Sequence, residues 1–162
     1  MLIRDAVPAD APVVCEVLRR SIAELCAADH RNDPKILGAW LANKQPEIVA
    51  SWIGQPDASM LVAVEAGKIL GVAGVTHDGE ITLNYVSPDA RFRGVSRALL
   101  AATEVRTAEN GNARCTLIST ETARRFYLAA GYVEVGPPQD KFGTHSSYPM
   151  EKQLSGPRRE RP

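Results

Sequence analysis

The sequence lacks a long apolar run, and this absence excludes a membrane-spanning helix. None of its 162 residues lies in a stretch of the roughly eighteen uninterrupted apolar residues that such a helix requires. The start, Met1 to Asp5, also lacks the basic stretch and apolar run of a signal peptide. We therefore expect a cytoplasmic protein without a membrane partner.

A surplus of either charge is also missing. Nineteen Lys and Arg residues balance nineteen Asp and Glu residues, so the net charge is zero. No strong overall field attracts the chain to nucleic acid, and no nucleic-acid partner is expected. A net charge of zero still allows a local patch of basic residues.

Cysteine is scarce, and its spacing excludes two kinds of small-domain scaffold. Cys15, Cys26 and Cys115 are odd in number, widely spaced and outside any Cys-x-x-Cys pair. This pattern argues against a disulfide framework and against a structural zinc site. We predict three buried, reduced thiols and no bound metal.

The apolar patterns that are present predict one α/β domain over residues 1–152. A 44% hydrophobic content is enough for one sizeable core. The tail over residues 153–162 is rich in Arg and Pro and is predicted to be disordered. Periodicity and turn signals predict, in order, a strand at 2–3, helices over 13–25, 36–42 and 46–53, strands at 61–64, 68–75 and 81–86, a helix around 98–105, a strand at 115–118, a helix over 123–130 capped by Ser119 or Thr120, and strands at 132–135 and 148–152.

The segment from Val86 to Leu100 predicts an anion-binding loop. It runs from a buried strand through a short basic turn into a helix, whose first backbone N–H groups lack internal partners and lie at the positive end of the helix dipole. Small residues at Gly94 and Ser96 allow a ligand to approach the backbone. Three arginines add positive charge: Arg91, Arg93 and Arg97. The alternative is a tight turn with a solvated basic face, whereas Walker and dinucleotide-binding fingerprints are absent.

Two motifs give the chain a family resemblance. The run Arg91-x-x-Gly94-x-Ser96 resembles the Gln/Arg-x-x-Gly-x-Gly/Ala signature of the GNAT N-acetyltransferases, with Ser where Gly or Ala is usual. The segment from Thr120 to Tyr132 resembles the family's Asn-x-x-Ala-x-x-Phe-Tyr-x-x-x-Gly-Phe, with Thr for Asn and Tyr for the last Phe. The resemblance extends from Met1 to Lys152 and is strongest from Ile69 to Tyr132.

The resemblance implies a fold and a cosubstrate. The fold is an α/β GNAT fold with a central, mostly antiparallel twisted sheet of about six to seven strands, flanked by helices and splayed between the fourth and fifth strands. Acetyl-coenzyme A is expected in the splay, where its pantetheine pairs with strand backbone like an added peptide. The implied contacts are Leu83, Asn84, Tyr85 and Val86 on the strand, Arg91, Phe92, Arg93, Gly94, Val95, Ser96 and Arg97 in the loop, and Thr120, Ala123 and Phe126 downstream.

The implied reaction is direct attack of an amine on the thioester within a ternary complex. Tyr127 is the expected general acid, which gives a proton to the leaving thiolate. Taken without the family, Phe126 and Tyr127 would instead be a packed core pair. Glu80 is our first choice of general base, ahead of His77 and Asp78, with a solvent-facing strand residue as the alternative interpretation.

The acceptor is expected between the helical segment Ile22 to Trp40 and the loop Gly136 to Ser147. Candidate acceptor-binding residues are Asp29, His30 and Asp33 for a cationic substrate and Trp40 as an apolar wall. They could equally be helix caps, a solvated loop and a core tryptophan. The expected partner is an amine on a small molecule or a peptide, and a homodimer is left open.

Two other functions compete with acetyl transfer. One is a non-catalytic module of the same fold that binds or senses acyl-coenzyme A. The other is a nucleic-acid binder with a basic loop, against which the neutral net charge counts. Its basic residues would be Arg91, Arg93, Arg97, Arg124 and Arg125.

Overall fold

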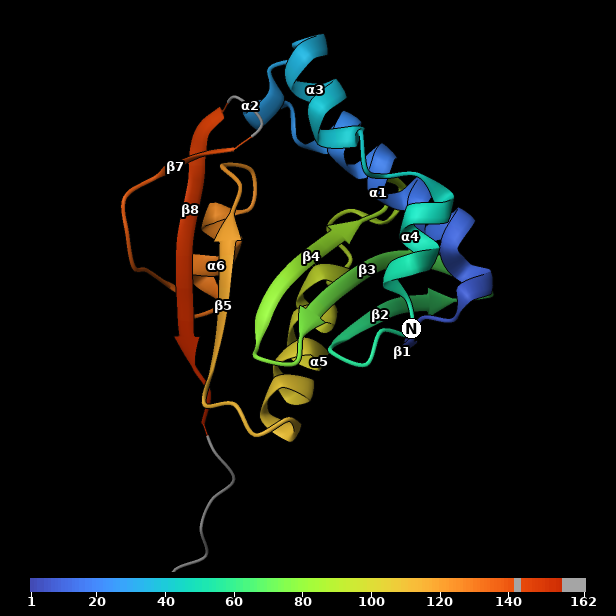
Figure 1. The fold of residues 1–162 in the computed structure, drawn as a ribbon, viewed down its shortest axis with the longest axis vertical. Helices are drawn as coiled ribbons and strands as arrows, with labels where there is room; N and C mark the ends of the chain where they lie inside the picture. The colour runs from blue at the N-terminus through green and yellow to red at the C-terminus, as the bar shows by residue number, and fades with distance from the viewer. Residues whose placement is uncertain (142–143, 156–162) are drawn as a thin grey trace, which may run out of the picture.

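A single mixed sheet organises the fold in the computed structural model, which describes residues 1–141 and 144–155 (Figure 1). The order across the sheet is β1-β2-β3-β4-β5-β8-β6, with β7 paired to β8 off this path. Neighbouring strands are antiparallel except for β4 and β5, which are parallel. The described strands are β1 Leu2–Asp5, β2 Ala58–Glu65, β3 Lys68–Thr76, β4 Glu80–Val86, β5 Arg114–Ser119, β6 Val133–Glu134, β7 Gln139–Lys141 and β8 Thr144–Gln153.

Helices cover both faces of the sheet. Helices α1 and α4 pack on one face of the β1–β4 half, and α5 packs on the other (Figure 1). None of the helices in the described part of the chain is long and apolar enough to cross a membrane. The described helices are α1 Ala11–Leu25, α2 Ala27–His30, α3 Pro34–Leu41, α4 Pro46–Trp52, α5 Val95–Glu109 and α6 Arg124–Ala129, with short 3-10 helices at Pro8–Asp10 and Pro88–Ala90.

The uninterrupted apolar run of β2 is explained by burial on two sides. Met60 and Val62 pack in the core under α1 and α4, whereas Leu61 and Ala63 pack in the core under α5. A strand that is covered on both faces has no need for polar residues at alternate positions. The same reasoning applies to β3, whose residues join both cores.

The predicted splay between the fourth and fifth strands is confirmed. Strands β4 and β5 pair only at Glu80 with Thr116 and at Ile81 with Leu117. Beyond these two pairs the strands separate toward their C-terminal ends (Figure 1). The residues of β4 after Ile81 therefore have no strand partner on the β5 side in the described structure.

The predicted loop 136–147 and the predicted tail need correction. Strand β7 and the first residues of β8 occupy most of that loop, because Thr144 to Ser147 extend the strand without the apolar alternation that signals one. The predicted tail starts too early. Its first residue, Gln153, still belongs to β8, and the Leu154 N–H donates to the Ala113 carbonyl at 2.7 Å. The rest of the predicted tail, 156–162, lies outside the described residues.

All three cysteines are buried, as predicted. Burial raises the pKa of each thiol, and that of Cys26 rises to about 12. These thiols therefore stay protonated at neutral pH and act as small apolar core groups.

Candidate functional site

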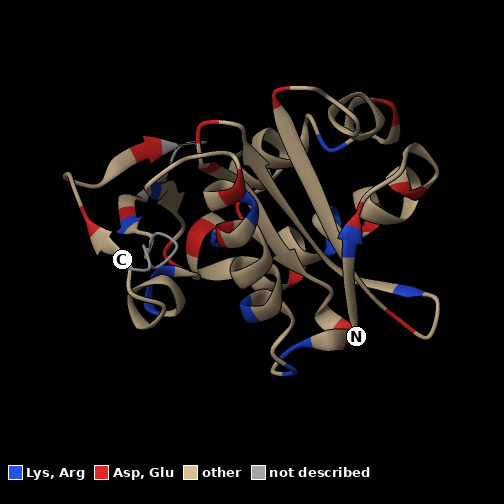
Figure 2. Ribbon diagram, turned by 90° about the horizontal axis from the view of Figure 1, so that it is seen from below, with Lys and Arg blue, Asp and Glu red and all other residues tan. Residues whose placement is uncertain are grey.

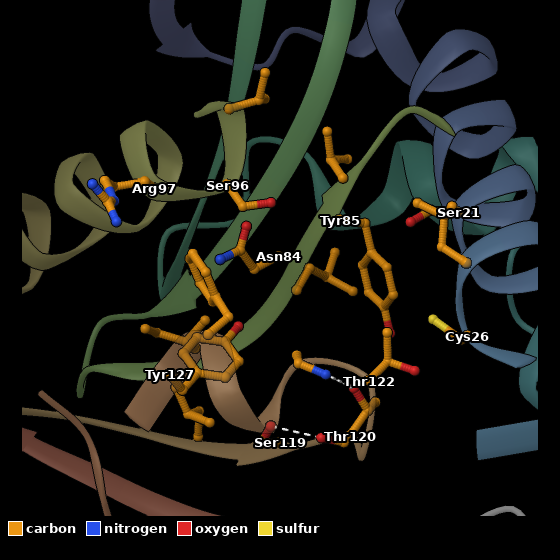
Figure 3. Close-up of a pocket in the computed structure, with 18 of the residues that line it drawn as sticks. Ser21, Cys26, Asn84, Tyr85, Ser96, Arg97, Ser119, Thr120, Thr122 and Tyr127 are labelled. Atoms are coloured by element: carbon orange, nitrogen blue, oxygen red, sulfur yellow. Dashed lines mark hydrogen bonds between the residues drawn. The ribbon is translucent and has the colours of Figure 1, made fainter. Parts of the chain in front are cut away.

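A cavity of about 670 Å³ lies where β4 and β5 separate (Figure 3). We call it the splay cavity. Its walls come from β4, β5, the loop between β4 and α5, the turn before α6, and α1. The residues expected to contact a cosubstrate that line it are Leu83, Asn84, Tyr85, Val86, Arg91, Phe92, Gly94, Val95, Ser96, Arg97, Thr120, Ala123 and Phe126.

At one end of the splay cavity, the N-terminus of α5 has no cap. Gly94 precedes the helix with a φ of 77°, and no side chain in the described structure hydrogen-bonds to this terminus. The helical hydrogen bonds of α5 begin with the Ala98 N–H, which donates to the Gly94 carbonyl at 3.0 Å. A Cβ on Gly94 would meet nothing within 4 Å, so the space in front of it is open. The preceding N–H groups can therefore receive an anion.

The loop residues that follow Arg91 point to different places. Phe92 is 93% exposed and has a φ of 60°, which is unusual for a bulky residue. The Arg91 guanidinium lies 4.6 Å from the centre of the Phe92 ring. Arg93 forms an ion pair with Glu65 at the end of β2 and does not line the splay cavity, so its expected role in cosubstrate binding gains no support from the geometry.

The turn before α6 is capped from two sides. The Thr120 hydroxyl accepts the Ala123 N–H at 3.1 Å, so Thr120 caps this turn, whereas the predicted cap residue of the helix itself is replaced by Ala123. From α2, the Asp29 carboxylate accepts the Glu121 N–H at 2.7 Å and the Thr122 N–H at 3.1 Å. The backbone donors of this turn are therefore satisfied by protein groups.

Tyr127 lines the same cavity from the first turns of α6 (Figure 3). Its ring packs edge-on against Phe126 and Tyr132, with centroid distances of 5.1 and 5.5 Å. Burial raises the pKa of Tyr127 to about 12, and contact with the Asn84 side chain opposes that shift. The phenol is therefore protonated throughout the neutral range.

Strand β4 brings unpaired polar groups to the cavity. The buried Oδ1 of Asn84 has no hydrogen-bond partner among the described residues. The register between β3 and β4 shifts at Gly74 and Val75, which pair with Leu83 and Ile81, so Thr82 is the extra residue of a β-bulge. A bulge takes one residue out of the ladder, and an orphan acceptor requires a donor, so both features suit a bound ligand.

The residues expected to bind a cationic acceptor do not line the splay cavity, and their place in an acceptor site stays a prediction. Asp29 is committed to the turn before α6. His30 is fully buried, with Nε2 2.9 Å from the Ile22 carbonyl and Nδ1 accepting the Asn32 N–H at 3.0 Å. Asp33 caps α3 by accepting the Lys35 N–H at 2.8 Å.

Glu80 is the first residue of β4 and is exposed. Its backbone N–H donates to the Thr76 hydroxyl at 3.1 Å, and it does not line the splay cavity. Neither His77 nor Asp78, the other candidate bases, lines this cavity. The assignment of Glu80 as general base stays a prediction.

A second cavity, of about 450 Å³, lies between β4 and the α3–α4 region. We call it the tryptophan cavity, because Trp40 and Trp52 both line it. It shares Thr82, Leu83 and Tyr85 with the splay cavity, so the bulge of β4 lines both cavities. Trp40 was expected as an apolar wall of the acceptor site, whereas Trp52 at the end of α4 was not, because its partners are distant in sequence.

No group of three His, Cys, Asp or Glu side chains in residues 1–141 and 144–155 is placed to hold a metal ion. The site is thus described by its backbone donors, its arginines and one buried phenol.

The chain matches the family described as Acetyltransferase (GNAT) domain over residues 31–154. The chain belongs to the GNAT acetyltransferase family.

Solved structures share this GNAT fold over nearly the whole chain. A GCN5-related N-acetyltransferase from Rhodopseudomonas palustris is 25% identical, with a TM-score of 0.83 and coverage of 94% of this chain and 95% of that one. The PaiA N-acetyltransferase from Thermoplasma acidophilum, solved with coenzyme A, is 20% identical, with a TM-score of 0.81 and coverage of 94% and 98%. A comparison with curated protein sequences gives no match.

The charges of this GNAT domain are mixed in sign over its surface. Figure 2 shows Lys and Arg interspersed with Asp and Glu along the elements. Two of the arginines that could bind nucleic acid are paired with carboxylates, Arg93 with Glu65 and Arg124 with Glu134. This arrangement gives no support to a nucleic-acid binding surface.

Proposed function

We propose that the protein transfers an acetyl group from acetyl-coenzyme A to an amine. The observation that carries this proposal is that one cavity holds both an uncapped helix N-terminus and a buried, protonated tyrosine. The first suits a pyrophosphate and the second suits a leaving group that needs a proton. Membership of the GNAT family and the CoA-bound relatives of the same fold support it.

The residues of the splay cavity fit coenzyme A. The open space in front of Gly94 leaves room for a pyrophosphate against the N–H groups of α5, with Arg91 and Arg97 beside it. The backbone of β4 from Leu83 onward faces no strand on the β5 side, so it can pair with the amides of pantetheine. The orphan Oδ1 of Asn84 offers an acceptor for one N–H donor.

The thioester of the cosubstrate supplies an activated acetyl group. As the amine nitrogen forms its bond to the carbonyl carbon, the carbon–sulfur bond breaks and the sulfur leaves as a thiolate. Tyr127 holds on its Oη the proton that converts this thiolate to a thiol. Burial raises the pKa of Tyr127. The same desolvation would raise the pKa of a thiol beside it, so the pKa values of donor and acceptor stay closer together than the pKa of Tyr127 alone suggests.

One observation favours a non-catalytic acyl-coenzyme A binding module as the second candidate. No carboxylate or imidazole side chain of the described residues lines the splay cavity. A conventional general base is therefore missing from this wall, although Tyr127 is in place as an acid.

The deciding experiment is an acetyl-coenzyme A consumption assay with a broad amine panel. Free thiol would be followed by a chromogenic reagent and the acetylated amine by mass spectrometry. We expect stoichiometric release of coenzyme A and acetylated product with at least one amine. Tight binding of acetyl-coenzyme A by calorimetry without consumption by any amine would favour the binding module.

A further inference from the structure

The tryptophan cavity differs from the splay cavity in the chemistry of its walls. Its lining combines a large apolar and aromatic part, Trp40, Trp52, Met60, Leu83 and Tyr85, with neutral polar side chains such as Asn43, Gln55 and Thr76. Its volume of about 450 Å³ lies within the usual range for a small-molecule site. The bulge of β4 lines both this cavity and the splay cavity, so an amine held against the bulge would lie next to the proposed cosubstrate site.

The described residues provide no carboxylate in the tryptophan cavity to pair with a cation. No Asp, Glu or His side chain of the described residues lines it from α3, α4, β2, β3 or β4. Its titratable lining groups are Lys44, whose ammonium donates to the Asn43 Oδ1 at 2.8 Å, and Tyr85. Burial raises the pKa of the Tyr85 phenol, so it carries no charge near neutral pH.

An apolar cavity discriminates between the two forms of an amine. Transfer of an ammonium ion from water to apolar surroundings carries a large desolvation penalty, whereas the neutral amine loses much less. The cavity thus selects the form that can attack a thioester, and the amine leaves its proton in bulk water before it binds. A side-chain base is then unnecessary for the first step.

Resting on the proposed function, we propose that the acceptor is an apolar primary amine, with an aromatic or branched hydrocarbon body, that binds in neutral form in the tryptophan cavity with its nitrogen at the β4 bulge. The nitrogen forms a bond to the carbonyl carbon and the carbon–sulfur bond breaks. The nitrogen gives up one proton to water or to Tyr127, and the sulfur gains one from Tyr127, so no net proton is released from the neutral amine. Polyamines are poor acceptors because a second ammonium would have to enter the apolar part of the cavity.

Intrinsic fluorescence reports directly on this cavity, because Trp40 and Trp52 are the two tryptophans of the chain. Phenethylamine and spermidine would be titrated into the protein saturated with coenzyme A, at pH 7 and pH 9. We expect a saturable change with phenethylamine, with an apparent affinity that rises about tenfold per pH unit below the pKa of the amine, which is near 10 as for lysine. Spermidine should give a weaker response. Equal affinity for the two amines, or an affinity for phenethylamine that is independent of pH, would overturn the proposal.

A matched pair of variants tests the charge argument. Gln55 is exposed and lines the cavity, so Gln55→Glu adds a carboxylate with almost no change in volume, at the cost of the Gln55 bond to the Ser51 carbonyl. Gln45 is exposed but does not line it, which makes Gln45→Glu the control. We expect Gln55→Glu alone to raise the relative affinity for spermidine several-fold and to flatten the pH dependence. An identical response of the two variants would count against the site.

Turnover separates this inference from the proposed function. With phenethylamine, kcat/KM should rise about tenfold per pH unit from pH 7 to pH 9. A plateau set by an enzyme group near the ordinary pKa of histidine or a carboxylate would overturn binding in the neutral form. Saturable phenethylamine binding with no acetylation of any amine would support the ligand class while refuting acetyl transfer.

Discussion

The N-terminal ends of α5 and α6 both reach the splay cavity, but they differ in what satisfies their backbone donors. At α5, Gly94 opens the helix without a capping side chain, and the space before it is empty of protein atoms. At α6, Thr120 and Asp29 occupy the donors of the preceding turn. The α5 end can therefore bind an anion, whereas protein groups already accept hydrogen bonds from the backbone donors before α6.

This difference assigns separate tasks to the two ends. The α5 end should determine how tightly coenzyme A binds, because its free donors meet the charged part of the ligand. The α6 end should determine the rate of chemistry, because its caps fix the turn from which Tyr127 projects. Changes at the two ends should consequently separate affinity from turnover.

The largest expected effect is on turnover, from Tyr127→Phe. The substitution keeps the ring that packs on Phe126 and Tyr132 and removes only the proton donor. Positioned acid catalysis contributes about a hundredfold to ten-thousandfold, so kcat should fall by about a hundredfold or more with little change in acetyl-coenzyme A affinity. Steady-state kinetics would measure kcat, and calorimetry would measure the affinity for acetyl-coenzyme A. Full turnover under conditions where chemistry limits the rate would make Tyr127 a packing residue.

At the α5 end, Gly94→Glu should weaken coenzyme A binding by about a hundredfold, since a side chain and a negative charge enter the space meant for phosphate. Gly54→Glu is the matched control. Gly54 has a φ of 78°, close to the 77° of Gly94, and a Cβ there also meets nothing within 4 Å, but it does not line the splay cavity. Calorimetry with coenzyme A should show normal binding for the control. Equal losses in the two variants would mean that backbone strain, and not the phosphate site, is responsible.

Asp29→Asn should act at the α6 end and chiefly on stability. The amide keeps one acceptor oxygen for the Glu121 and Thr122 N–H groups but loses the charge, which should cost about 1–3 kcal/mol of unfolding free energy. Coenzyme A affinity should change less than turnover does. Urea unfolding, with Asp33→Asn as a cap variant on α3, provides the comparison. An affinity loss as large as that of Gly94→Glu would contradict the division of tasks.

The smallest expected effect concerns thiol labelling of Cys26. Burial raises its pKa to about 12, so its thiolate is scarce at pH 8 and labelling should be slow, with a rate that rises with pH. Asp29→Asn should speed labelling several-fold because it loosens the turn that covers this residue, whereas Gly94→Glu should not. Peptide mass spectrometry after timed alkylation would identify the site. Rapid labelling of Cys26 in the unaltered protein would contradict the burial and the raised pKa of this thiol.

The parts of the molecule that sequence analysis predicted well are those built from neighbouring residues. The α5 helix, the β2–β4 meander and the loop at Gly94 follow from local periodicity, turn residues and a short motif. Thr120 was predicted as a cap for the same reason, since its partner Ala123 is three residues away.

The parts that escaped prediction depend on contacts between distant residues. Asp29 was expected at an acceptor site, but it caps a turn more than ninety positions away in the chain. The tryptophan cavity brings Trp40 and Trp52 against β4, and no local pattern signals that they share a wall. Asp29 and Asp33 both accept backbone N–H groups, a use that no local pattern distinguishes from acceptor binding, and their place in an acceptor site stays a prediction.

The Asp29 contact has a mechanical consequence. At one end of the opening between β4 and β5, the two strands are held together by two residue pairs. At the other end, Asp29 links α2 to the turn after β5. Contacts at both ends restrain the distance between β4 and β5. We therefore expect Asp29 to limit how far the two strands can separate, and with it the width available to a ligand between them.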